Sequence, residues 1–263
     1  MQKVYEALSS AFRRNEGYLS KPAYERIVQK YITFFEDIDT LFLLLQASGY
    51  PITEEADRYR LETYFTDYTK QKYCVVDIET NGSKPETAQV IEVGAVMVVD
   101  GQIVDRFESF VACTFVPEYI SKITGITHDD LLGASTQLTV LQNLRIFMED
   151  AIFVAHNVNF DYGFLNYSFE RFGLGTIGNE KLCSIDLSRR TIESKRYGLA
   201  YLSESLGLGE HDHHRAFSDA LVTTKLLGLT FDGLPEYVKT ADDLVVFSRS
   251  SRKERSIQKK IKS

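Results

Sequence analysis

Acidic residues and histidines gather in three short segments of this sequence, each beside an apolar run. In the first segment, Asp77 and Glu79 end the run YCVVDIE, which is expected to be a buried strand. Alternate residues of a strand share a face, so both side chains point the same way. Two carboxylates held this close repel each other unless a cation lies between them. Because acidic residues also end many strands at turns, this pair alone leaves an ordinary structural role open.

The second segment is HNVNFD, residues 156–161, directly after the apolar run IFVA. Asp161 is expected to start the next helix, where its side chain could serve as an N-terminal cap. Strand ends that lead into helices are also where α/β proteins place their functional sites. The position of Asp161 is therefore compatible with either role.

The third segment is HHRAFSDA, residues 213–220. His214 precedes a predicted helix that carries Asp219 in its opening turns. Histidine is suited to proton transfer near neutral pH, and aspartate is a hard oxygen ligand for metal ions. The neighbouring His211 and His213 are expected to be bystanders in a solvated loop.

Taken in this order, the three segments resemble the motifs of the DEDDh branch of the DnaQ-like exonucleases, which have a ribonuclease-H-like fold. The segment ITGITHDDL at 123–131 is similar to the loop between the first two motifs of that family. The resemblance covers residues 72–232, about 60% of the chain, with no departure at the carboxylates or the histidine. The three motifs look like Asp77-Ile78-Glu79-Thr80, His156-Asn157-x-x-Phe160-Asp161 and His214-x-x-x-x-Asp219.

The resemblance implies a metal-dependent 3′→5′ exonuclease that hydrolyses phosphodiester bonds. Two divalent cations, Mg²⁺ or Mn²⁺, would neutralise the transition state and activate the attacking water. His214 would be the general base, and since only neutral imidazole accepts a proton, activity should fall as the pH drops. The carboxylates that the resemblance assigns to the metal ions are Asp77, Glu79, Asp161 and Asp219.

The same resemblance implies which residues meet the nucleic acid. Glu79 and the backbone of Thr80 would contact the terminal 3′ nucleotide, and His156 and Asn157 are also assigned to substrate binding. Phe160 and the segment 123–126 are candidates for stacking on the last base, a contact that tolerates any sequence. A place in the hydrophobic core is an equally open interpretation of Phe160.

Several functions remain open for such a chain. The leading hypothesis is an exonuclease acting on a single-stranded or frayed DNA 3′ end, in repair or in proofreading, with a DNA polymerase catalytic subunit as partner. This hypothesis follows the resemblance to the epsilon subunit of bacterial DNA polymerase III. An RNA 3′-end trimming enzyme is the first alternative, because nothing in three short motifs reads a 2′-hydroxyl. The others are a non-catalytic scaffold that docks on a polymerase and a winged-helix transcription factor.

The elements that must position these residues form an α/β domain at 72–232. Its order of strands and helices, β-β-β-α-β-α-β-α, predicts a mixed five-stranded sheet with helices on its faces. The first hairpin is expected to turn at Asp100-Gly101, a favoured two-residue loop. Gly94, inside a strand, predicts a bulge or a close backbone approach.

Residues 1–70 predict a separate helical module with helices near 2–14, 22–34 and 36–48, followed by a β-hairpin. This is the outline of a winged helix, although a simple helical appendage is the alternative. A recognition helix should offer basic or amide side chains to DNA bases. Because helix 36–48 instead offers Glu36, Asp37 and Asp39 and then an apolar stretch, a role in protein contacts is expected.

The composition limits the remaining possibilities. The net charge is −7, but the last fifteen residues carry +6 and the rest −13, so a basic and disordered tail is expected to end a C-terminal extension at 233–263. The acidic balance argues against extended duplex binding but not against a metal-dependent nuclease. No apolar run approaches the length of a membrane span. Three widely spaced cysteines are typical of buried thiols in a reducing cytoplasm.

Overall fold

The computed structural model describes residues 1–31, 37–209 and 214–251, and a five-stranded mixed sheet forms its centre. The strand order is β6-β5-β4-β7-β8, with antiparallel pairing from β6 to β4 and parallel pairing from β4 to β8. This confirms the predicted sheet. Its strands are β4 (Tyr73–Thr80), β5 (Val90–Val99), β6 (Gln102–Phe110), β7 (Ile152–Ala155) and β8 (Lys181–Cys183).

The hairpin that starts the sheet turns where the sequence predicts it. Asp100 has φ 52° and Gly101 has φ 70°. Two successive residues with positive φ are the geometry of a type I′ turn, whose twist matches that of the flanking strands. The turn therefore sets the pairing of β5 with β6, which continues to Phe110 opposite Glu92.

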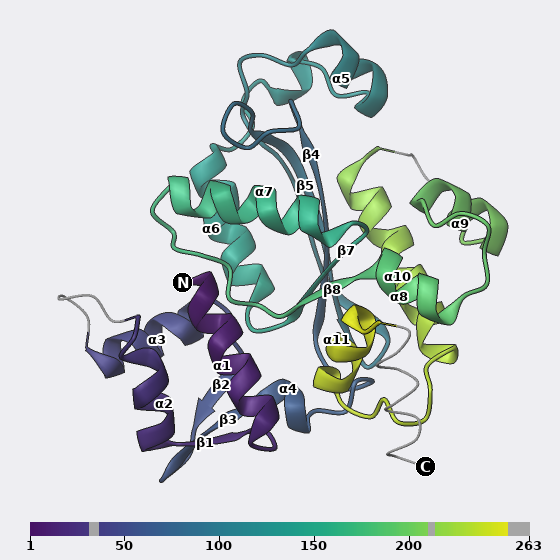
Figure 1. Ribbon diagram of the computed structural model, residues 1–263. Helices are drawn as coiled ribbons and strands as arrows, with labels where there is room; N and C mark the ends of the chain where they lie inside the picture. The colour runs from purple at the N-terminus through teal and green to yellow at the C-terminus, as the bar shows by residue number, and fades with distance from the viewer. Residues whose placement is uncertain (32–36, 210–213, 252–263) are drawn as a thin grey trace.

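Helices cover both faces of this sheet (Figure 1), with α6 and α7 on one side and α8, α10 and α11 on the other. Because successive side chains of a strand alternate, Cys74 and Val76 of β4 pack towards α6 and α7, whereas Tyr73 and Val75 pack towards α10 and α11. A strand buried on both faces explains the continuous apolar run of β4. The helices are α5 (Glu118–Thr124), α6 (Gln137–Met148), α7 (Val158–Arg171), α8 (Ser184–Thr191), α9 (Leu199–Leu206), α10 (Ala216–Asp232) and α11 (Ala241–Arg249), with a short 3₁₀ turn at Asp129–Leu131.

After residue 72, three elements differ from the prediction. Helix α7 begins at Val158 with Asn157 at its N-cap, so Asp161 lies inside the first turn and does not cap the helix. Strand β8 ends at Cys183, and the helix α8, which was not predicted, follows at once. Its eight residues include few apolar ones, so the sequence has no clear helical pattern there. Helix α11 was not expected within 233–263, yet it has a complete capping box between Thr240 and Asp243.

A smaller structure lies at the N-terminus, the purple region of Figure 1. Its three strands form an antiparallel sheet in the order β1-β3-β2. The predicted helices and hairpin are present, but α2 ends at Val28, and residues 32–36 of the predicted helices, Glu36 included, lie outside the described part. β1 and the short helix α4 were not predicted, and the hairpin ends at Leu61, before the last residues of the segment expected to form it. The elements are α1 (Gln2–Arg14), β1 (Tyr18–Ser20), α2 (Lys21–Val28), α3 (Ile38–Ala47), β2 (Ile52–Glu54), β3 (Arg58–Leu61) and α4 (Glu62–Phe65).

The third helix of this region lacks the side chains of a base-reading helix. α3, with sequence IDTLFLLLQA, contains no Lys, Arg or Asn, and its one amide side chain, Gln46, donates to the carbonyl of Ile52 at 3.2 Å. Asp37 caps its N-terminus by accepting a hydrogen bond from the backbone of Thr40, and Leu43 is 64% exposed. An exposed leucine beside acidic residues suits a protein contact better than a DNA groove. The contact role of residues 1–70 stays a prediction.

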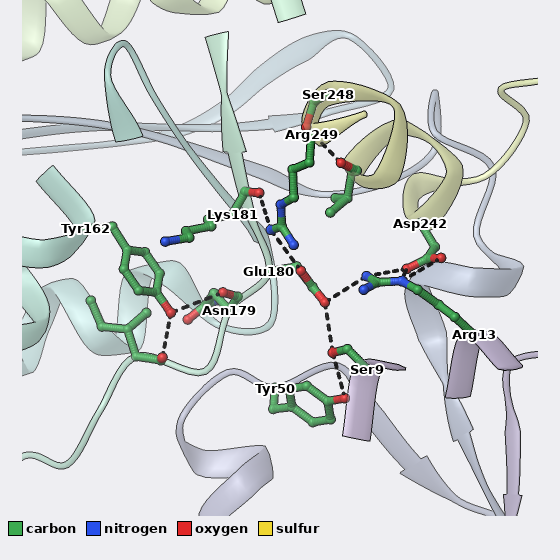
Figure 2. A network of polar contacts seen from close by, with 12 residues as sticks. Ser9, Arg13, Tyr50, Tyr162, Asn179, Glu180, Lys181, Asp242, Ser248 and Arg249 are labelled. Carbon is green, nitrogen blue, oxygen red and sulfur yellow. Dashed lines mark hydrogen bonds and ion pairs between the residues drawn. The ribbon is translucent and has the colours of Figure 1, made fainter. Parts of the chain in front are cut away.

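Residues 1–70 pack directly on the α/β domain through a buried polar cluster (Figure 2). Its centre is the carboxylate of Glu180, which accepts hydrogen bonds from Ser9 at 3.0 Å, Arg13 at 3.1 Å and Arg249 at 3.1 Å. Arg13 also donates to Asp242 of α11. The cluster therefore joins α1, the residue before β8 and α11.

Candidate active site

Strand β4 brings the first two carboxylates to the face of the sheet that α10 covers. Tyr73 and Val75, which have the same parity as Asp77 and Glu79, pack in the cluster formed with α10 and α11. Asp77 therefore points towards α10, and Glu79 lies one step further along the same face. The strand pairing changes register between Glu79 and Thr80, because β5 carries an extra residue, Ile91, opposite this step of β4.

Helix α10 approaches this face at its N-terminus because Gly94 has no side chain. A Cβ atom at Gly94 would lie 2.2 Å from the backbone nitrogen of Phe217. This confirms the prediction of close backbone approach at Gly94. Asp219, in the first turn of α10, is consequently buried against β4 and β5.

The histidine of the third motif joins these carboxylates. Ligand atoms of Glu79, His214 and Asp219 all lie within 4.8 Å of one another. The backbone N–H of His214 donates to Oδ2 of Asp219 at 3.2 Å. His214 is exposed, so water can reach a ring nitrogen that lies beside two carboxylates. His211 and His213, the predicted bystanders, lie outside the described residues.

Asp161 completes the acidic cluster from α7. It is 4% exposed, and its charge is one of those that raise the pKa of Asp77. Backbone N–H groups of Ile78 and of Asp161 itself support its carboxylate. The structure thus brings together the residues of all three motifs, from β4, α7, the residue before α10 and α10 itself.

The proton affinity of these carboxylates is raised first by their burial and, for Asp77 and Glu79, also by neighbouring negative charges. Burial, followed by the charges of Asp161 and Asp219, raises the pKa of Asp77 well above its ordinary value. Burial and the charge of Glu92 raise the pKa of Glu79 to about 8. Burial also raises the pKa of Asp161 to about 7, against the opposing effect of its backbone hydrogen bonds.

This donor set fits divalent cations. Four carboxylates, partly or fully buried within one cluster, are stable in their ionised form at neutral pH only if positive charge is added. Oxygen ligands and incomplete enclosure match hard ions such as Mg²⁺, which keep several of their waters. The residues that would hold such ions are Asp77, Glu79, Asp161 and Asp219.

Of the predicted substrate-binding residues, His156 has both ring nitrogens occupied within the protein. Nε2 donates to the carbonyl of Tyr197 at 2.9 Å, and Nδ1 accepts from Ser184 at 2.8 Å. Burial lowers the pKa of His156 to about 4, so the ring is neutral. These bonds hold the strand end in place. Asn157 adopts the left-handed conformation, φ 83°, at the start of α7.

The predicted base-stacking residues separate into exposed and buried ones. Phe160 is 37% exposed and lines a groove of about 480 Å³ between α7 and residues 83–86, so it lies outside the core. Ile123 is 52% exposed, whereas Ile126 is buried. Thr80 is buried, and its hydroxyl donates to the carbonyl of Gly82. The role of each in substrate binding stays a prediction.

One pair beside the site was missed from the sequence. Glu92 on β5 is 1% exposed and lies opposite Glu79 in the strand pairing. Its carboxylate accepts from the guanidinium of Arg215, which directly follows His214. The sequence does show Glu92 as a charged residue inside an otherwise apolar strand. Its partner, Arg215, is distant in the sequence and could not be identified from it.

Known proteins share the family and the fold of this chain. Residues 74–227 match the RNase_T family model, described as an exonuclease. A DNA polymerase III PolC-type of Staphylococcus haemolyticus is 39% identical over 155 residues, which are 58% of this chain and 11% of that protein. The chain therefore spans about a tenth of the length of such relatives.

Solved structures show the same fold. Exonuclease X in complex with 5′ overhanging duplex DNA has a TM-score of 0.52 and 22% identity, covering 67% of this chain and 99% of that one. The nuclease domain of 3′hExo, a DEDDh family member bound to rAMP, has a TM-score of 0.55 and 19% identity, covering 64% and 96%. With the matched family model covering more than half of its length, the chain belongs to the RNase_T exonuclease family and carries a ribonuclease-H-like hydrolytic exonuclease domain.

Proposed function

We propose that this chain removes single nucleotides from the 3′ end of DNA, in proofreading or repair. The observation that carries the proposal is the convergence of Glu79, His214 and Asp219 within 4.8 Å, beside the buried carboxylates of Asp77 and Asp161. Relatives named as DNA polymerase III PolC-type favour DNA as the substrate.

In the proposed reaction the chain supplies ligands, a base and a surface for the terminal nucleotide. Two bound Mg²⁺ or Mn²⁺ ions would lower the pKa of the attacking water and neutralise charge on the transition state. His214, exposed and adjacent to two of the carboxylates, takes the proton from that water. Neutral His214 is required for this step, so the rate falls as the pH is lowered.

The groove beside α7 is the proposed place for the last base. Phe160 offers an exposed ring there, and Glu86 and Asn159 add polar groups at its edge. Stacking on a ring tolerates any base, as an enzyme that removes every nucleotide requires. Glu79 and the Thr80 backbone would contact the terminal sugar. His156 and Asn157 would hold the end of β7 in the conformation that substrate binding needs.

The proposed partner of the chain is a DNA polymerase catalytic subunit, because the curated relatives are polymerases. Residues 1–70, with the exposed Leu43 and Leu44 on α3, are the proposed contact module, followed by the nuclease at 72–232 and the extension at 233–263. Within the described residues, no helix is both long and apolar enough to cross a bilayer. Three free thiols support a reducing, cytoplasmic setting.

Digestion of 5′-labelled oligonucleotides tests the proposal, because the label reveals the direction of cutting. The substrates are duplex DNA with a paired or a mismatched 3′ end, single-stranded DNA and single-stranded RNA, each with Mg²⁺ or EDTA. We expect one-nucleotide ladders from the 3′ end, fastest on frayed DNA and abolished by EDTA. Asp77→Asn should lower the rate at least about 100-fold, since it removes a metal ligand without changing shape.

RNA trimming is the second candidate, favoured by the structural similarity to 3′hExo, which was solved with rAMP. A faster ladder on RNA than on DNA, with the same metal dependence and the same loss in Asp77→Asn, would move the chain to RNA processing. Cutting from the 5′ end, or cutting that survives EDTA and Asp77→Asn alike, contradicts the proposed mechanism.

A further inference from the structure

Glu92 connects the centre of the sheet to the chain segment that carries His214. Oε1 of Glu92 accepts from Nη2 of Arg215 at 2.8 Å and from Nε at 3.1 Å. Oε2 accepts from the backbone N–H of Ala216 at 3.0 Å. Glu92 is 1% exposed and lies in a strand that is paired on both sides. It is therefore a rigid support for Arg215 and Ala216.

The contact with Ala216 caps helix α10 from outside. The first N–H groups of a helix have no partner within it and need an acceptor. Arg215, the N-cap residue, makes no side-chain cap of its own. Glu92 supplies that acceptor from β5, and its negative charge suits the positive end of the helix dipole.

His214 lies directly before this clamped segment and has an unusual backbone conformation. Its φ of 62° falls in the left-handed region, which only a few per cent of residues with a side chain adopt. On one side, its own N–H donates to Asp219 at 3.2 Å. On the other side, the next residue is Arg215, which is held by Glu92.

We propose that Glu92 and Arg215 are positioning residues for the exonuclease reaction. By fixing the backbone at Arg215 and Ala216, the pair keeps the imidazole of His214 beside Glu79 and Asp219. Phe110, whose ring lies 5.3 Å from the guanidinium carbon of Arg215, supports the other side of this side chain. The proposal rests on the proposed role of His214 as the base, and it requires no contact of Glu92 with the nucleic acid.

The main test variant is the double substitution Glu92→Gln with Arg215→Met, because it removes both charges together. Arg215→Met alone would leave a buried carboxylate without its partner and endanger folding. The control is Arg106→Met, which replaces an exposed arginine on β6 far along the strand from Phe110. A misplacement of about 1 Å costs up to about 100-fold in rate, so we expect kcat to fall about 10- to 100-fold with KM little changed.

A double-mutant cycle then separates positioning from other roles. In a His214→Ala background at saturating Mg²⁺, the Glu92→Gln and Arg215→Met changes should lower the remaining rate less than about twofold, since their effect on the chemical step runs through His214. Saturating Mg²⁺ is needed because Glu92 and Arg215 act in opposite directions on the pKa of Glu79. An unchanged kcat, the same 10- to 100-fold loss without His214, or a rise in KM alone that points to phosphate binding by Arg215 would each overturn the proposal.

One readout needs no substrate and keeps the two proposals distinguishable. The Cε1–H resonance of His214, assigned by its loss in His214→Ala, should move in the double variant and stay in place in Arg106→Met. If the wild type cuts no nucleic acid, the proposed function fails, while this shift still shows that Glu92 and Arg215 fix the position of the His214 ring. A resonance at its wild-type position in the double variant overturns the positioning role, whatever the activity.

Discussion

At the scale of single residues, the acidic cluster ties metal binding to pH. The pKa of Glu79 is about 8 and that of Asp161 about 7 without a metal ion. Protons therefore compete with Mg²⁺ for the same oxygens below about pH 8. We expect Mg²⁺ affinity, measured by calorimetry, to rise between pH 6 and pH 8 and its binding to release protons. An affinity that does not change over this range contradicts the cluster as the metal site.

The same pKa values predict that substituting Asp161 raises the stability of the metal-free protein while it abolishes activity. A carboxyl group with a raised folded-state pKa binds more protons when folded, so the metal-free protein loses stability as the pH rises from about 4 to 8. Asp161→Asn removes this penalty and should stabilise the metal-free protein at pH 8 by about 1–2 kcal/mol while abolishing activity. Urea unfolding in EDTA measures this change in the free energy of unfolding.

The control for that variant is Asp130→Asn. Asp130 is exposed and accepts from Thr127, and those hydrogen bonds lower its pKa, the opposite direction to Asp161. Its substitution should therefore bring no stabilisation at pH 8 and leave the metal dependence unchanged. A destabilised Asp161→Asn protein would show that the hydrogen bonds of the Asp161 carboxylate outweigh the cost of burying its charge.

At the scale of elements, the approach of α10 to the sheet depends on Gly94. Gly94→Ala would place a carbon against the backbone of Phe217 and push the helix start away from β4. We expect a loss of about 1–3 kcal/mol in unfolding free energy and a clear loss of exonuclease rate. The matched control is Gly228→Ala in the same helix, where nothing lies within 4 Å, and which should stabilise by about 0.5–1 kcal/mol.

The elements also show what could be predicted from the sequence and what could not. Long periodic patterns such as β5, α6 and α10 were predictable, as were motif residues whose chemistry restricts their type. The strand β1 has three residues and exists because β3 pairs with it. The role of Glu92 depends on Arg215, which only the folded chain brings beside it. Contacts distant in sequence leave no local pattern to find.

At the scale of the whole molecule, the cluster around Glu180 is one of the contacts that join residues 1–70 to the nuclease. Burial alone would raise the pKa of Glu180, but Arg249 and Arg13 together lower it. A lowered folded-state pKa contributes stability above the unfolded-state value and loses it as the pH falls through the folded-state value. Without its arginines, the buried carboxylate would instead become a cost at neutral pH.

Arg13→Met tests this coupling, since the change leaves Glu180 and Asp242 buried with one shared cation fewer. We expect a loss of about 3 kcal/mol in unfolding free energy at pH 7. Arg14→Met, one residue along and exposed, should change it by less than about 0.5 kcal/mol. Tyrosine fluorescence and circular dichroism should follow one shared transition in the wild type. Separate transitions would mean that residues 1–70 fold independently of the nuclease, and equal stability of both variants would mean that Arg13 does not couple them.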